Sequence, residues 1–253
     1  DTLESIASEK AGIIKSGVPV ITGATGKALQ IIENTAKEKR AKCYRYGHEF
    51  SSNNEVSQPD GEQFDFQSPF LTKNSMFIAM KGSHQVENAS LALMALDYLY
   101  FFFGLTVELE DLKAGLKSAS IKGRFEEVSE QPVIILDGAH NERATERLAE
   151  TIATRFPNHN IHVIFAALET KDVKQMLTYV EKVSDQLTLT TFSHPKALRA
   201  DELEPYVSAE HYVIKPNLKE LILELQNNRD DTTVYVITGS LYFISEVRHL
   251  LQS

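Results

Sequence analysis

The stretch Val133-Ile134-Ile135-Leu136-Asp137-Gly138-Ala139-His140-Asn141 decides the fold. Its four apolar residues predict a buried strand, and a helical pattern begins directly after the turn. Open α/β sheets bind ligands where a strand ends in such a turn. Asp137 and His140 can accept hydrogen bonds from a ribose or a base and can transfer protons. Helix capping by Asp137 or Asn141, with His140 packed nearby, is an alternative compatible with ligand binding.

Strands and helices alternate after residue 132, which predicts a mostly parallel sheet with helices on both faces. The expected strands cover 133–137, 161–166, 187–192, 213–214 and 234–237, and the expected helices cover 142–156, 171–185, 201–208, 218–226 and 241–251. Thr238-Gly239-Ser240 follows the last of these strands, so a hydroxyl there either caps the last helix or faces the same edge.

The pattern before residue 120 is less regular and mixes helices with short strands. Helices are expected near 1–13 and over 27–40, 85–103 and 106–118, with short strands at 18–23 and 42–46 and a hairpin or edge strand around Phe64, Phe66 and Phe70. Residues 120–123 are expected to be a linker. The chain is therefore divided into two domains, 1–121 and 122–253.

The composition restricts the class of protein. The 253 residues are 42% hydrophobic and 24% charged, with a net charge of -9, which disfavours general binding to nucleic acids or anionic membranes. Cys43 is the single cysteine, so neither a disulfide framework nor a cysteine-based zinc site is expected. The same observation predicts a cytoplasmic location. The apolar stretch 91–105 is too short and interrupted to span a bilayer. Because Asp1-Thr2-Leu3 resembles the interior of a domain, the chain is expected to be part of a longer protein.

One glycine-rich stretch, Ile21 to Ala28, invites comparison with a phosphate-binding loop. That loop needs glycine, four residues, and then Gly-Lys followed by Ser or Thr. Ile21 and Ala28 break the pattern at both ends. A turn between a strand and a helix is the favoured interpretation.

Two basic residues have a functional and a structural interpretation each. Lys10 lies among small and apolar residues in Glu9-Lys10-Ala11-Gly12-Ile13. It is either a solvated helix lysine or a buried lysine whose lowered pKa lets the neutral amine react with CO2, and the resulting carbamate could orient Mg²⁺. Arg124, beside the linker, either forms a structural salt bridge or holds a phosphate with its fork of donors.

Several of these segments together resemble the folylpolyglutamate synthase/dihydrofolate synthase family of the Mur ligase superfamily. The resemblance covers nearly the whole chain, in the family's order and spacing. It rests on Asp1-Thr2-Leu3, Glu9 to Lys15, His84-Gln85 with Asn88-Ala89, Gly123-Arg124-Phe125-Glu126, Leu136 to Asn141, and Thr238-Gly239-Ser240-Leu241-Tyr242.

The resemblance implies an ATP-dependent ligase that joins L-glutamate to a folate or dihydropteroate carboxylate through an acyl phosphate. It implies that Lys10 is a carbamate serving the Mg²⁺ centre, that Asn88, Arg124 and Asp137 contact ATP, and that Lys10, Arg124 and His140 form the catalytic set. The implied partners are small molecules, with no nucleic acid or membrane, and the implied state is a monomer.

The resemblance also implies how the domains divide. Residues 1–121 correspond to the end of a central P-loop ATPase-type domain, and residues 122–253 correspond to a Rossmann-like glutamate ligase domain. The family's phosphate loop and most of its Mg²⁺ ligands precede the position of Asp1, so the chain alone is expected to be inactive. Two alternatives stay open: another Mur-type ligase, for instance one acting on a cell-wall nucleotide precursor, and a non-catalytic nucleotide-binding module.

Overall fold

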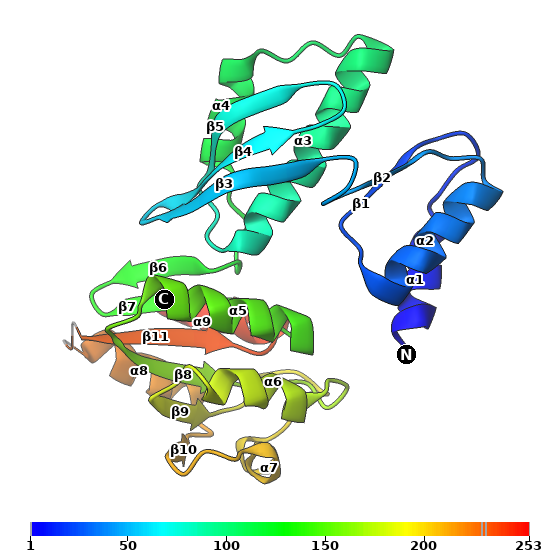
Figure 1. The fold of residues 1–253 in the computed structure, drawn as a ribbon. Coiled ribbons are helices and arrows are strands. Elements are labelled where there is room, and N and C mark those ends of the chain that lie inside the picture. Colours follow the sequence, from blue (N-terminus) through cyan, green and yellow to red (C-terminus); the bar gives the residue numbers. More distant parts are fainter. Residues whose placement is uncertain (1, 229, 231, 253) are drawn as a thin grey trace. The chain divides into compact units, whose positions relative to one another are not determined.

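The computed structural model describes residues 2–228, 230 and 232–252, and the chain divides into two compact units (Figure 1). The first unit is Asp1–Ala119 and the second is Ser120–Ser253. This division lies close to the boundary expected between residues 121 and 122. Among the described residues, no helix is long and apolar enough to cross a membrane.

The second unit is built on a six-stranded sheet with the order β10-β9-β8-β11-β7-β6. All neighbouring strands are parallel except β6, which pairs antiparallel with β7. The strands are β6 (Glu126–Glu130), β7 (Val133–Leu136), β8 (Asn160–Phe165), β9 (Gln186–Leu189), β10 (Tyr212–Ile214) and β11 (Thr233–Thr238). The predicted mostly parallel sheet is confirmed, and β6 is an edge strand that the sequence pattern did not predict.

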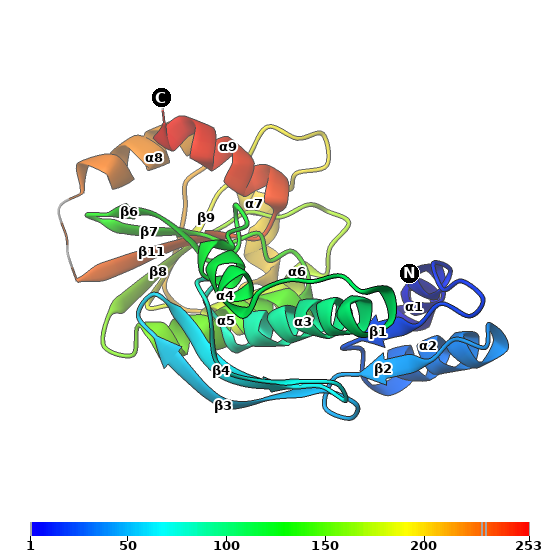
Figure 2. The ribbon, with the colours of Figure 1, turned by 90° about the horizontal axis from the view of Figure 1, so that it is seen from above.

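Helices cover both faces of this sheet, with α5 and α6 on one side and α8 and α9 on the other (Figure 2). The helices are α5 (Glu142–Arg155), α6 (Val173–Glu181), α7 (Ala200–Leu203), α8 (Leu218–Asn227) and α9 (Leu241–Leu251). Successive strand residues point to opposite faces, so Ile135 of β7 packs with α5 and α6, whereas Ile134 and Leu136 pack with α8 and α9. A strand buried on both faces must be apolar throughout, which explains the unbroken run in β7.

The first unit contains two small sheets. The parallel pair β1 (Val20–Thr22) and β2 (Cys43–Arg45) accompanies α1 (Leu3–Ala11) and α2 (Gly26–Glu38). The antiparallel sheet consists of β3 (Ser51–Gln58), β4 (Gly61–Gln67) and β5 (Thr72–Ile78), and it is followed by α3 (Ser83–Phe103) and α4 (Leu109–Ser118). Phe64 and Phe66 are fully buried and pack in one core with residues of α3 such as Leu93. The predicted hairpin is therefore confirmed.

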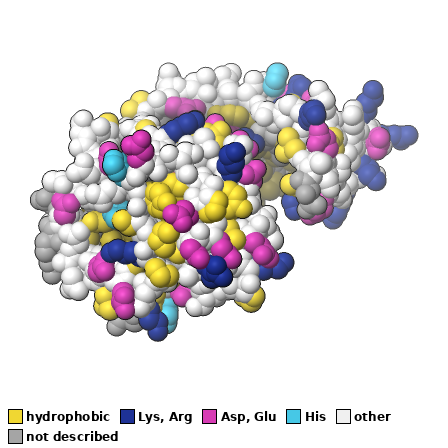
Figure 3. All heavy atoms as spheres, turned by 90° about the horizontal axis from the view of Figure 1, so that it is seen from below, with side chains coloured by type: hydrophobic (Ala, Val, Ile, Leu, Met, Phe, Trp, Pro, Cys, Tyr) yellow, Lys and Arg dark blue, Asp and Glu magenta, His cyan; other side chains and the backbone are white. Residues whose placement is uncertain are grey.

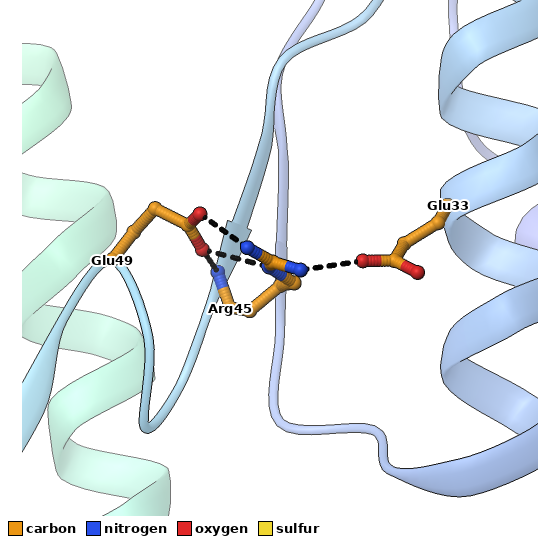
Figure 4. Close-up of polar contacts among 3 residues, drawn as sticks. All are labelled: Glu33, Arg45 and Glu49. Carbon is orange, nitrogen blue, oxygen red and sulfur yellow. Dashed lines mark hydrogen bonds and ion pairs between the residues drawn. The ribbon is translucent and has the colours of Figure 1, made fainter.

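An arginine between two glutamates ties α2 to the end of β2 (Figure 4). The Arg45 guanidinium contacts Glu33 Oε1 at 2.8 Å and Glu49 Oε1 at 2.7 Å. The Arg45 backbone N–H also donates to Glu49 Oε2 at 2.8 Å. This arginine lowers the pKa of Glu49 to about 2. The network fixes the turn that leads from β2 toward β3.

Candidate active site

Two loops of the second unit meet at the carboxyl end of β7. One is the segment 120–125, and the other is the turn from Asp137 to Asn141 that leads into α5. The Gly138 N–H donates to the Gly123 carbonyl at 2.8 Å, and the Asp137 N–H donates to the Ile237 carbonyl of β11 at 3.0 Å. The turn is thus anchored to the sheet and to the first loop. This is the edge where parallel sheets bind ligands.

The carboxylate of Asp137 joins the same two loops. Its Oδ2 accepts from the Phe125 N–H at 2.8 Å, and its Oδ1 accepts from the Ala139 N–H at 2.8 Å. Burial raises the pKa of Asp137, whereas the two backbone donors and the nearby charges of Arg124 and His140 oppose that rise. Asp137 does not cap α5. Asn141 does, because its Oδ1 accepts from the Ala144 N–H at 2.9 Å.

Arg124 precedes Phe125, the residue whose backbone N–H donates to Asp137. Its backbone N–H donates to the Ile121 carbonyl at 3.1 Å, and its side chain is partly buried. Within the described part of the chain, no ion pair or hydrogen bond of the Arg124 guanidinium is found. The structure therefore does not support a structural salt bridge at this position, although the charge of Arg124 lies near enough to Asp137 to oppose the rise that burial causes in the pKa of that carboxyl.

His140 is held in one orientation by its own turn. Its Nδ1 lies 2.7 Å from the Gly138 carbonyl oxygen. A carbonyl only accepts, so Nδ1 carries the hydrogen and the neutral ring presents Nε2 as an acceptor. The histidine is partly buried, and its position three residues after Asp137 places it on the same turn.

The segment after β11 caps the last helix. The Ser240 Oγ accepts from the Tyr242 N–H at 3.3 Å, so Ser240 is the N-cap of α9. Gly239 has a φ of +117°, and a Cβ there would lie 2.3 Å from the Ala166 carbonyl oxygen. The hydroxyl of Thr238 is buried and has no hydrogen-bond partner among the described residues. Of the two expectations for these hydroxyls, capping is confirmed for Ser240.

The predicted site residues of the first unit lie on two different helices. Lys10 on α1 has a side chain that is 71% exposed, and its Nζ contacts Glu9 at 3.0 Å. Of the two interpretations of Lys10, the solvated helix lysine agrees with the structure and the buried lysine does not, because the side chain leaves α1 on a solvent-facing side. Asn88 on α3 is also exposed, and its Nδ2 donates to Gln85 Oε1 at 3.1 Å. No cluster of metal-binding side chains is found among the residues that the structure describes.

Two charged residues that contact the Arg124 loop were not assigned a role from the sequence. Glu126, at the start of β6, forms an ion pair with Arg248 of α9 through both of its oxygens. Its Oε2 also accepts from the Gly123 N–H at 2.5 Å. Glu126 belongs to a quoted motif, but Arg248 follows it by 122 positions and no sequence signal connects them.

Comparison with known proteins shows which families this chain resembles. Residues 123–241 match the model described as "Mur ligase, glutamate ligase domain". The chain is 35% identical to a dihydrofolate synthase/folylpolyglutamate synthase of Bacillus subtilis over 253 residues, which is 100% of this chain and 59% of that protein. The chain therefore spans less than two thirds of the length of this relative.

Solved structures match the whole chain as well. A folylpolyglutamate synthase of Mycobacterium tuberculosis complexed with ADP has a TM-score of 0.89 at 25% identity, covering 100% of this chain and 61% of that one. A bifunctional folylpolyglutamate synthase/dihydrofolate synthase of Yersinia pestis, complexed with AMPPNP and a manganese ion, has a TM-score of 0.84 at 24% identity, covering 100% and 58%.

The second unit, with its mostly parallel sheet and its anchored loops, is thus a glutamate ligase domain of the Mur ligase type. Along its whole length the chain is similar to dihydrofolate synthase/folylpolyglutamate synthases, which supports a place among the Mur ligases.

Proposed function

We propose that this chain is part of an ATP-dependent ligase that joins L-glutamate to the carboxylate of a folate or a dihydropteroate. The observation that carries the proposal is the Arg124 guanidinium, which is presented beside the Asp137 turn without a protein partner among the described residues. An arginine held in this way can bind a phosphate with two parallel hydrogen bonds. The similarity to the Bacillus subtilis enzyme along all of the chain supports the same function.

In this proposal ATP is the nucleotide that the ligase uses. Arg124 binds the phosphates, and the Asn88 amide contributes a further contact to the nucleotide. Asp137 already accepts one backbone N–H on each oxygen, and each oxygen keeps a lone pair for the ribose or the base. The ADP and AMPPNP in the related structures support a nucleotide as a ligand of this protein.

Mg²⁺ is the proposed metal, and Lys10 is the residue of this chain proposed to serve it. An ammonium that pairs with Glu9 cannot bind a cation, so the proposal requires that Lys10 reacts with CO2 to form a carbamate. The exposed side chain gives CO2 access to Nζ. Bound Mg²⁺ would neutralise charge on the phosphate oxygens during transfer. The manganese ion in the Yersinia pestis protein supports a divalent metal.

The proposed reaction has two steps. ATP first phosphorylates the acceptor carboxylate, and the amino group of glutamate then attacks the acyl phosphate and releases phosphate. Phosphoryl transfer depends on positioning and on charge stabilisation, which Arg124 supplies. His140 is proposed to contact the reacting groups through Nε2, because Nδ1 is occupied by the Gly138 carbonyl.

The proposal extends to partners and location. We propose that the protein acts on small molecules as a cytoplasmic monomer, without binding nucleic acids or membranes. The net charge of -9 and the single cysteine support this environment. Residues 1–253 alone are proposed to be inactive, because the stretch Ile21 to Ala28 lacks the phosphate-loop pattern.

The decisive experiment measures ATP-dependent ligation by the full-length gene product. Radiolabelled glutamate is supplied with dihydropteroate, with a reduced folate, or with a cell-wall nucleotide precursor, and ADP release is followed in parallel. We expect glutamate incorporation only with the two pterin substrates. Incorporation into the cell-wall precursor would favour a different Mur-type ligase, and ATP binding without any ADP release would favour a non-catalytic module.

A further inference from the structure

The backbone around Arg124 is held in an unusual conformation. Gly123 has a φ of +73° and Phe125 a φ of +44°, so both neighbours of Arg124 are in the left-handed region. This region is costly for a bulky residue such as phenylalanine, and it persists only where the surroundings enforce it. Phe125 is buried at 6% exposure and stacks on Phe156 with a centroid distance of 6.4 Å.

Two carboxylates enforce this conformation, one on each side of Arg124. The Phe125 N–H donates to Asp137, and the Gly123 N–H donates to Glu126. The amide of Arg124 itself donates to the Ile121 carbonyl at 3.1 Å. The backbone amides of Gly123, Arg124 and Phe125 are thus all hydrogen-bonded. The Arg124 side chain forms no hydrogen bond or ion pair with a described residue.

The carboxylate of Glu126 is in turn held by Arg248 of α9. The pair joins both nitrogens of the Arg248 fork to both carboxylate oxygens, and the side chains are 16% and 25% exposed. Fork-to-fork pairs fix geometry as well as charge. Arg248 also lowers the pKa of Glu126, so the carboxylate stays ionised as an acceptor for Gly123.

We propose that Arg248 and Glu126 are positioning residues that hold the Arg124 loop in the conformation that binds the nucleotide phosphates. The proposal rests on the proposed function of Arg124. It gives α9 a role beyond packing, because its Arg248 acts on the active site through Glu126 and the Gly123 amide. A displacement of about 1 Å in a catalytic group can cost up to about a hundredfold in rate, so a loop held on one side only should lose turnover.

The test is a double-substitution cycle in the full-length gene product. Arg248→Met should reduce kcat about tenfold with little change in the KM for glutamate. Arg248→Lys keeps the charge but not the forked guanidinium, so its kcat should lie between those of Arg248→Met and the wild type. In an Arg124→Ala background, Arg248→Met should cause no further loss, because the two residues act through one path. Arg199→Met, which removes an arginine that is 70% exposed and paired with Asp201, is the matched control and should leave kcat unchanged.

A second readout does not depend on activity. Amide hydrogen exchange at Gly123 and Phe125 should become faster in Arg248→Met, whereas exchange in β8 should not change. Additive losses of kcat in the two backgrounds, or unchanged exchange at Gly123, would overturn the proposal. If the wild type shows no ligation at all, the proposed function fails, and the exchange result alone then decides whether Arg248 holds the loop.

Discussion

The two units of the chain differ in how they organise their candidate site residues. In the second unit, Asp137 and His140 lie on a turn that is anchored to the six-stranded sheet, and Arg124 lies on a loop anchored to that turn. In the first unit, Lys10 and Asn88 lie on exposed helical positions, and each contacts a residue close to it in the sequence. The second unit therefore positions its site within itself, and the first does not.

Both units expose large apolar side chains, and the first unit exposes more of them among the described residues. In the first unit these include Ile13, in the turn after α1, at 80% exposure and Phe103, at the end of α3, at 72% exposure. The second unit also exposes apolar side chains, such as Leu223 at 57% exposure, and on the face seen in Figure 3 hydrophobic side chains are grouped between charged ones. Apolar surface of this kind is normally covered by other protein or by a ligand. The surroundings of Lys10 and Asn88 therefore depend on what covers the surface of the first unit.

The largest effect is expected from a glycine of the second unit. Gly239→Ala should destabilise the chain by about 4 kcal/mol, since the new Cβ would meet the Ala166 carbonyl in addition to the strain of a positive φ. Gly104→Ala in the first unit is the control. Gly104 also has a positive φ, of +69°, but no atom lies within 4 Å of its Cβ position, so about 1 kcal/mol is expected. Urea unfolding of both variants measures the difference, and equal losses would show that the Gly239 contact is relieved by the backbone.

A buried ion pair tests the first unit. Lys73 and Asp97 pair at 8% and 4% exposure, and Ser68 Oγ donates to Asp97 at 2.7 Å. Lys73→Met should cost about 3 kcal/mol, because it leaves the Asp97 carboxylate buried without a cation. Lys113→Met removes an exposed pair with Glu110 and should cost less than about 1 kcal/mol. Amide hydrogen exchange in β4 and β5 measures the destabilisation in both variants. If Lys73→Met destabilises the unit no more than Lys113→Met does, water must reach Asp97.

A smaller effect depends on pH. The pKa of Glu49 is lowered to about 2 from a usual 4.5 by Arg45, so the pair stabilises the first unit above pH 4.5 and loses this contribution as the pH falls toward 2. Glu49→Gln should cost about 1 kcal/mol at pH 7. The difference between variant and wild type should shrink as the pH approaches 2. A difference that is constant from pH 7 to pH 2 would contradict the lowered pKa.

The sequence predicted most of the second unit correctly because its signal is local. Each buried strand is an apolar run and each helix has one apolar face, so the alternation from Val133 to Leu251 could be recognised without knowledge of tertiary contacts. The exception is β6, where Glu126, Glu127 and Glu130 hide a strand that pairs with β7 at the sheet edge. Charged residues are frequent on edge strands, which gives them a weak pattern.

The site was predicted only in part, for a different physical reason. Asp137 and His140 follow a strand, so their place at the sheet edge could be inferred. The left-handed conformation of Phe125 and the contact of Glu126 with Arg248 depend on groups distant in the sequence, which leave no periodic signal. The buried alternative for Lys10 relied on its small neighbours, but these describe one side of α1 and the lysine lies on another, as the solvated alternative expects.

The central claim is that the second unit presents Arg124 ready for a nucleotide phosphate. The most direct test is Arg124→Ala in the full-length gene product, with kcat and the free energy of unfolding measured on the same preparation. We predict a loss of at least about tenfold in turnover, about 1.4 kcal/mol in the barrier, with a smaller effect on stability, because the guanidinium forms no hydrogen bond or ion pair with a described residue and acts on Asp137 only through its charge. Unchanged turnover, or a loss explained by unfolding, would contradict the claim.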